Sequence, residues 1–219
     1  MRLSDLLFPP RCLSCRVLSS GWLCSACAAA FPRIEACCDR CGRPSMRPVA
    51  GCAACCRARP PWRFARAAAV YEGPARDALM TFKLGGERRA AHGLAAAMVE
   101  SSAGLSRTAV TFVPATRRAV AVRGFNPARE LSRQVARALG VQCVGTLRKT
   151  RETRDQAGLG RLERRENLRG AFAAVARPPR SLLLVDDVMT TGATAAECAR
   201  ALLNAGVVEI DVLTFARAL

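Results

Sequence analysis

The sequence predicts an α/β protein with a mostly parallel sheet and flanking helices, preceded by a small cysteine-rich module. Ten of the twelve cysteines fall before residue 57, which sets the N-terminal segment apart from the rest. Beyond it, strand-like and helix-like hydrophobic patterns alternate, as expected for parallel strands joined by crossover helices. One strand ends in two adjacent acids followed by threonine and glycine. Ligands bind at the carboxyl ends of strands in such sheets, so this pattern marks a candidate site.

Length and composition indicate how the chain is divided. With 219 residues, of which 51% are hydrophobic, the chain can form one substantial core and a small module. We place the small module at residues 1–58 and the α/β domain at 59–219. No apolar run approaches the roughly 20 residues of a membrane span, and the start "MRLSDLLFPPRC" lacks the apolar stretch of a signal peptide. We therefore expect a cytoplasmic protein without a membrane span.

The net charge is +17, and the only lysines are Lys83 and Lys149, so almost all of the positive charge is arginine. Arginine presents a planar fork of donors that suits phosphate and nucleic acid. A biased genome composition explains such an excess equally well. Either origin predicts some affinity for polyanions at low salt.

The cysteines form four C-x-x-C pairs, each of which can grip one tetrahedral ion, so two structural zinc sites are expected. Pairing by order gives one site from Cys12, Cys15, Cys24 and Cys27, and another from Cys38, Cys41, Cys52 and Cys55. The spacing leaves a cross-braced pairing open. An iron–sulfur cluster and redox dithiols are the alternatives to zinc. Because the module buries little apolar surface, the metal is expected to supply much of its folding energy.

The elements of the second domain follow in order. After a Pro/Arg-rich linker, residues 64–71 read as a strand. Apolar residues at helical spacing predict two helices within 73–102, separated at Gly85–Gly86. Residues 108–115 form a buried strand. A helix over 126–140 has Asn126 as its N-cap, Pro127 at its first position and Gly140 at its end.

The remaining pattern is a short strand at 141–150, a polar and strongly basic stretch at 151–170, a central strand at 181–187, a helix at 194–206 and a last strand at 207–219. From Arg117 to Arg169 the chain has fourteen basic and five acidic residues.

The stretch "SLLLVDDVMTTGAT" delivers Asp186 and Asp187 to the carboxyl edge of the sheet. Neighbouring side chains on a strand point to opposite sides, so the two acids need not do the same work. They can accept hydrogen bonds from a vicinal diol or hold Mg²⁺ through water. The Thr/Gly segment then opens a helix, whose N-terminal N–H groups and dipole favour an anion. A diol and a phosphate together describe a ribose 5-phosphate.

The signature "LLLVDDVMTTGAT" closely resembles that of type I phosphoribosyltransferases, which use 5-phospho-α-D-ribose 1-diphosphate (PRPP). The cysteine pairs and three further segments resemble one branch, the ComF/GntX-like competence family, with a double zinc ribbon before a phosphoribosyltransferase domain. Those segments are "YEGPARDALMTFKLGG", "RGFNPARELSRQVARALG" and "TRDQAGLGRLERRENLRGAF". The resemblance implies a type I phosphoribosyltransferase-like fold over residues 59–219.

The same resemblance implies roles for single residues. Asp186 and Asp187 would contact the ribose hydroxyls and serve as the catalytic pair. The 5-phosphate would lie against Thr190, Thr191, Gly192, Ala193 and Thr194. The pyrophosphate would lie against Ala115, Thr116 and Arg117. A mobile flap or hood would contain Arg123, Gly124, Phe125, Asn126, Gln156, Arg165 and Asn167.

Three functions remain open at this stage. The first is a PRPP-dependent transferase that uses Mg²⁺ and an unidentified acceptor. The second is a protein of DNA uptake that associates with single-stranded DNA and senses or merely retains PRPP binding. The third is an adaptor whose zinc module recruits a competence or uptake partner. The intact Asp pair and Thr/Gly segment favour a retained PRPP site over a dead scaffold.

Overall fold

A computed structural model describes residues 9–84, 90–105, 108–151, 161–175 and 177–219. Five strands form one sheet whose neighbours all pair in parallel. In spatial order they are β1 (Ala65–Val70), β7 (Glu209–Arg217), β6 (Ser181–Met189), β2 (Ala109–Phe112) and β3 (Gln142–Cys143). The predicted mostly parallel sheet is confirmed.

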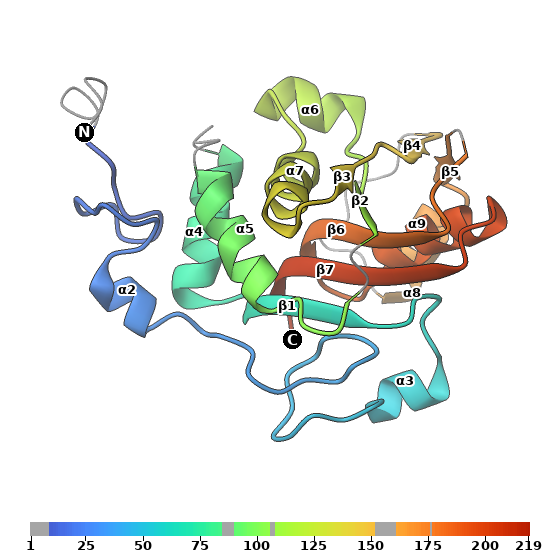
Figure 1. Cartoon of the computed structure of the whole chain (residues 1–219), viewed down its shortest axis with the longest axis horizontal. Helices are drawn as coiled ribbons and strands as arrows, with labels where there is room; N and C mark the ends of the chain where they lie inside the picture. The colour runs from blue at the N-terminus through green and yellow to red at the C-terminus, as the bar shows by residue number, and fades with distance from the viewer. Residues whose placement is uncertain (1–8, 85–89, 106–107, 152–160, 176) are drawn as a thin grey trace.

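Helices cover both faces of this sheet (Figure 1). One face carries α5 (Ala90–Glu100), α7 (Pro127–Leu139) and, beside α5, α4 (Gly73–Leu84). The other face carries α9 (Ala193–Asn204). Packed against α9 are α8 (Arg161–Leu168) and a separate antiparallel pair, β4 (Leu147–Lys149) and β5 (Phe172–Ala174).

The central strands are buried on both faces, as a parallel sheet between two helix layers requires. In β6, Leu183 and Val185 join the core under α5 and α7, whereas Leu182 and Leu184 join the core under α9. This alternation follows from the two-residue period of a strand. It also places the two acids that follow Val185 on opposite faces.

Most predicted elements of the second domain are present. The side chain of Asn126 accepts from the N–H groups of Ala128 and Arg129 at the start of α7, and Gly140 ends this helix at a φ of 68°. The expected break at Gly85–Gly86 lies outside the described residues. Among the described helices, none has the length and apolar character that crossing a bilayer requires.

The structure differs from the prediction at residues 117–123, 141–150 and 161–168. The expected single strand at 141–150 is split, because the chain leaves β3 at Gly145 and β4 pairs with β5 instead. The buried hydroxyls of Thr111 and Thr146, 2.7 Å apart, hold the chain at this turn. Helices α6 (Arg117–Arg123) and α8 form in segments that the sequence left without secondary structure. Neither segment has a strong apolar period to reveal it.

The cysteine-rich segment runs from α2 (Ser25–Ala29) to α3 (Ala53–Arg57) along the outside of the sheet (Figure 1). Between these helices it pairs with β1, the first strand of the sheet. The N–H of Ile34 donates to the carbonyl of Ala68 at 3.3 Å, and the N–H of Val70 donates to the carbonyl of Pro32 at 2.9 Å. The N-terminal segment therefore adds a short antiparallel piece to the β1 edge.

Apolar side chains of the N-terminal segment also enter the core under α4 and α5. Leu13 and Leu23 are buried there, and Trp22 makes edge contacts with Phe31 and Phe215 at ring distances of 5.4 and 6.3 Å. Trp22 packs so tightly on α5 that a β-carbon at Gly93 would lie 2.3 Å from its Cγ. The N-terminal segment and the sheet domain thus share one core.

The contact between Trp22 and α5 predicts an unusual response to Gly93→Ala. In an ordinary helix this change stabilises by about 1 kcal/mol. Here the new methyl group meets the rigid base of the indole, so we expect a net loss of about 1–3 kcal/mol in the free energy of unfolding. Urea titration of Gly93→Ala would measure the loss. Ala96→Gly, on the exposed side of the same helix, is the control and should lower the free energy of unfolding only by the lower helix propensity of glycine, about 1 kcal/mol. A Gly93→Ala protein that is more stable than the wild type would contradict the tight packing of Trp22 on α5.

Candidate functional site

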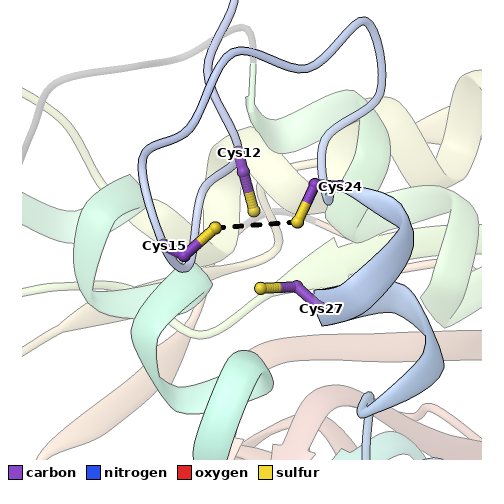
Figure 2. A group of neighbouring side chains, drawn as sticks. All are labelled: Cys12, Cys15, Cys24 and Cys27. Atoms are coloured by element: carbon purple, nitrogen blue, oxygen red, sulfur yellow. Dashed lines mark hydrogen bonds between the residues drawn. The ribbon is translucent and has the colours of Figure 1, made fainter.

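The first cysteine cluster consists of Cys12, Cys15, Cys24 and Cys27. Their four Sγ atoms all lie within 4.8 Å of one another, and the sulfurs of Cys15 and Cys24 are 3.6 Å apart. Figure 2 shows the four side chains converging, two from a loop and two from the start of α2.

The second cluster consists of Cys38, Cys41, Cys52 and Cys55, again with all Sγ atoms within 4.8 Å. The sulfurs of Cys41 and Cys52 are 3.8 Å apart, and the N–H of Cys52 donates to the sulfur of Cys38 at 3.1 Å. The structure therefore joins the pairs in sequence order, and the cross-braced arrangement that spacing left open is not formed.

Each cluster contains a thiol that ionises easily. Burial alone would raise the pKa of Cys12, but hydrogen bonds from the backbone of Cys24, Cys15 and Ser14 lower it to about 6. Burial likewise opposes ionisation of Cys52, but hydrogen bonds from the backbone of Cys55 and from neighbouring thiols lower its pKa to about 7. A thiolate is the form that binds a metal ion.

Four thiols at one point fit a tetrahedral zinc ion and leave no coordination position for substrate. The set of ligands in both clusters is therefore that of a structural zinc site. The two extra cysteines of this segment lie outside them. Cys37 is buried, which raises the pKa of its thiol, and Cys56 is exposed.

The two acids of β6 take opposite faces of the sheet. Asp186 follows the register of Leu182 and Leu184 toward α9, and Asp187 follows Leu183 and Val185 toward α4 and α5. The expectation that neighbouring acids can serve different functions therefore has a geometric basis here.

Asp186 is the acid that resists ionisation. Burial, together with the negative charge of Asp187, raises its pKa to about 8, against the opposing effects of the Asp187 N–H and of Lys83. That N–H donates to Asp186 Oδ1 at 2.9 Å. Burial and the neighbouring charge thus oppose ionisation of Asp186.

Asp187 is paired instead. Its Oδ2 lies 2.9 Å from the ammonium nitrogen of Lys83, near the end of α4, and the two side chains are only 17% and 16% exposed. Removing one partner of such a shielded pair leaves the other charge poorly solvated. Lys83 is thus a member of the site that sequence reasoning did not assign.

The β6–α9 loop, residues 190–192, leads from the strand into α9. Gly192 caps the helix with a φ of 77°, a left-handed conformation that favours glycine, and Thr191 Oγ1 accepts from the N–H of Ala193 at 3.3 Å. A small pocket opens here and contains the 5-phosphate residues of the prediction except Thr191. Its lining includes Asp186, Thr190, Gly192, Ala193, Thr194 and Thr214.

The chain after β2 holds the predicted pyrophosphate residues. Ala115 and Thr116 are half-buried, and Arg117 is exposed at the start of α6. Thr116 caps α6, because its Oγ1 accepts from the N–H of Ala119 at 3.0 Å. The β2 and β6 strands are neighbours in register, so this segment and Asp186 leave the same edge of the sheet.

The predicted flap residues lie in two places. Arg123 and Gly124 end α6, while Phe125 is buried edge-on against Phe82, with ring centroids 5.3 Å apart. The side chain of Asn126 donates to the carbonyl of Val113 and so ties the segment after β2 to α7. Asn167 lies near the end of α8, which packs on α9. Gln156 and the side chain of Arg165 lie outside the described residues.

Two further residues reach the site without having been predicted to do so. Trp62, from the linker, packs on Gly192, and Arg217, at the end of β7, donates to the carbonyl of Met189 at 2.9 Å. No motif marks either residue. Lys83 did carry a signal, as one of two lysines in a chain that otherwise uses arginine.

Comparison with known proteins agrees with this arrangement. Residues 3–58 match the family described as the double zinc ribbon domain. The chain is 32% identical to the DNA utilization protein YhgH of Salmonella typhi, covering 98% of this chain and 100% of that protein. It is 31% identical to competence protein F of Haemophilus influenzae, covering 95% and 97%.

Two solved structures show a weaker likeness. The allosteric regulatory enzyme of purine biosynthesis has a TM-score of 0.39 at 19% identity, covering 62% of this chain and 30% of that enzyme. Orotate phosphoribosyltransferase from Aeropyrum pernix has a TM-score of 0.36 at 17% identity, covering 61% and 75%.

Fold and site together define a parallel α/β protein that carries a double zinc ribbon and an acid-and-threonine site at the sheet's carboxyl edge. The near full-length likeness to its relatives identifies the family more narrowly. The chain belongs to the ComF-like competence family.

The Lys83–Asp187 pair can be tested by a double-mutant cycle. Lys83→Met leaves Asp187 shielded and unpaired, so we expect it to destabilise the protein by about 1–3 kcal/mol at pH 7. Asp187→Asn in the Lys83→Met background should recover part of this loss, giving a coupling energy of at least about 0.5 kcal/mol. Chemical denaturation of the four proteins measures the cycle. Additive losses would show that the pair contributes nothing to stability.

Proposed function

We propose that this chain binds PRPP at the carboxyl edge of its sheet, with the 5-phosphate in the β6–α9 loop pocket and the ribose beside Asp186. The observation that supports this most directly is the pocket itself, which combines a carboxyl group with threonines and the first residues of α9. The segment "LLLVDDVMTTGAT", which resembles the signature of type I phosphoribosyltransferases, points the same way.

The pocket suits a phosphate for electrostatic reasons. The N–H groups at the start of a helix have no partner within the helix, and the helix dipole is positive there. In this structure Thr191 Oγ1 accepts a hydrogen bond from the N–H of Ala193. A phosphate oxygen would take over this N–H, and the threonine hydroxyl would then donate to the phosphate.

The acids suit a ribose and Mg²⁺. Carboxylate oxygens are the ligands that this ion prefers, and Asp186 and Asp187 stand at the edge where the diphosphate of PRPP would lie. When bound, Mg²⁺ neutralises charge on that diphosphate. The exposed guanidinium of Arg117 adds positive charge from the segment after β2.

In the proposed reaction a nucleophile, such as a nitrogen lone pair, bonds to C1 of the ribose. The bond between C1 and the diphosphate oxygen breaks, and pyrophosphate leaves with the electron pair. The nucleophile then loses its proton to solvent. The chain contributes positioning and charge: the loop holds the 5-phosphate, and the acids stabilise the positive charge that develops on the sugar.

Calorimetric titration with PRPP and Mg²⁺ tests the proposal. We expect the wild type to bind and the double variant Asp186→Asn/Asp187→Asn to lose binding. Because the pKa of Asp186 is about 8 in the free chain, binding that favours its carboxylate should release a proton at pH 7, and affinity should rise from pH 6 to pH 8. Titration in buffers of different ionisation enthalpy counts this proton. No binding by the wild type would refute the proposal.

A second function has one specific observation in its favour. Arg129, Arg133 and Arg137 are all exposed on α7 at four-residue spacing, so they form a basic stripe on one side of the helix. Two relatives are named for DNA utilization and competence. A role in which the chain associates with single-stranded DNA, and retains PRPP binding without turnover, is the alternative proposal.

The salt dependence of DNA binding distinguishes a defined basic face from diffuse charge. For a single-stranded oligonucleotide, Arg133→Gln/Arg137→Gln should make the negative slope of log K against log salt less steep by about 1.4. The control is Arg43→Gln/Arg47→Gln, which removes the same charge from exposed positions near the second cysteine cluster. Equal effects of the two double variants would argue against a site on α7.

A further inference from the structure

The turn of the second cysteine cluster is joined to the β6–α9 loop through two side chains, Arg217 and Trp62. This turn, residues 38–42, which we term the second knuckle, contains the ligands Cys38 and Cys41. It is fixed to the start of β1, where the N–H of Ala65 donates to the carbonyl of Asp39 at 2.8 Å and Arg66 pairs with the Asp39 carboxylate at 2.8 Å. The backbone carbonyls of Arg40 and Cys41, two successive residues of the knuckle, accept hydrogen bonds from side chains that also contact the β6–α9 loop.

Arg217 makes the first connection. It is only 7% exposed, and its Nε donates to the carbonyl of Cys41 at 3.1 Å. Its Nη1 donates to the carbonyl of Met189 at 2.9 Å and to that of Thr190. One guanidinium thus joins a metal ligand's backbone to both residues that lead into the pocket.

Trp62 makes the second connection. Its indole N–H donates to the carbonyl of Arg40 at 2.5 Å. Its ring lies against the other end of the loop, where a β-carbon at Gly192 would be 3.3 Å from Cη2. Trp62 is 6% exposed, so this contact is shielded from solvent.

The direction in which these carbonyls point depends on the knuckle being closed. The N–H of Gly42 donates to the carbonyl of Cys38 at 2.8 Å, and an ion shared by the thiolates of Cys38 and Cys41 would complete the closure of this turn. Among the described residues, the first cluster has no comparable connection to the β6–α9 loop, because Leu13, Leu23 and Trp22 attach it to α4 and α5 on the other face of the sheet. The two cysteine clusters therefore differ in what they support.

We propose that the metal-loaded second knuckle holds the β6–α9 loop in its binding conformation, with Arg217 and Trp62 as positioning residues. Loss of metal from this cluster would loosen the loop and weaken 5-phosphate binding, while loss from the first cluster would not do so directly. The identity of the phosphate ligand rests on the function proposed above, but the effect on the loop itself does not.

Hydrogen–deuterium exchange without any ligand tests the effect on the loop. Cys55→Ser and Cys15→Ser each remove one ligand from one cluster, and metal analysis should find one zinc ion in each variant instead of two. In Cys55→Ser we expect exchange of residues 190–195 to rise by about tenfold or more. In Cys15→Ser the same peptide should stay within about twofold of the wild type. Unchanged exchange in Cys55→Ser, or an equal rise in both variants, would overturn the proposal.

Three further variants cover the case in which Cys55→Ser fails to fold. Trp62→Phe keeps a ring on Gly192 but loses the donor to Arg40, and Trp22→Phe is its match at the first cluster. Arg217→Lys keeps the charge but loses the fork that reaches the knuckle and the loop together. Faster loop exchange in Trp62→Phe and Arg217→Lys, but not in Trp22→Phe, is expected. If neither loop-facing variant changes exchange, the proposal fails.

Binding of two probes separates positioning from general damage. Ribose 5-phosphate affinity should fall by about tenfold in Arg217→Lys, whereas affinity for magnesium pyrophosphate, which does not use the loop, should stay within about twofold. Equal loss of both probes would indicate a general structural defect and count against a positioning role. If the wild type binds neither probe, the proposed function fails, and the exchange experiment still decides whether the knuckle orders the loop.

Discussion

Strand β6 is buried on both faces because helices cover each side of the sheet, and this burial determines where the two acids after Val185 must go. Leu182 to Val185 alternate between the two cores, and the next two residues continue the alternation as acids. Asp187 emerges on the side where α4 supplies Lys83, and Asp186 emerges on the side where α9 begins. Neighbouring positions on one strand thus hold an acid paired with a lysine and an acid whose ionisation is opposed by burial.

The cysteine-rich segment is built into the protein rather than tethered to it. Trp22 fills the space over Gly93 on one side of the molecule, and on another the second knuckle bonds to β1 and, through Arg217, is joined to the β6–α9 loop. An adaptor that uses the zinc module as an independent arm does not fit these contacts well. A module that shares the core of the sheet domain is better placed to stabilise the site than to reach away from it.

Much of the fold could be predicted because strong periodic patterns and clear caps coincide. The capped helix at α7, the apolar run of β6 and the C-x-x-C pairs are each local signals. The contacts of Lys83, Trp62 and Arg217 are not local. Each depends on where a distant segment docks, and nothing in the sequence around Trp62 or Arg217 records that. The split between β3 and β4, and helix α8, were missed because short segments take their form from what they pack against. Helix α6 was missed because its caps, Thr116 and Gly124, enclose only seven residues, none of them buried.

The pairing of residues 32–34 with β1 has a consequence for solubility. A sheet edge with free N–H and carbonyl groups can pair with another chain, and proteins commonly protect such edges. Here β3, at one end of the sheet, is only two residues long, and β1, at the other end, is covered by the segment between the two cysteine clusters. Metal loss that releases this segment would uncover residues 68–70, the apolar end of β1, so chelation would favour self-association of the chains as well as unfolding.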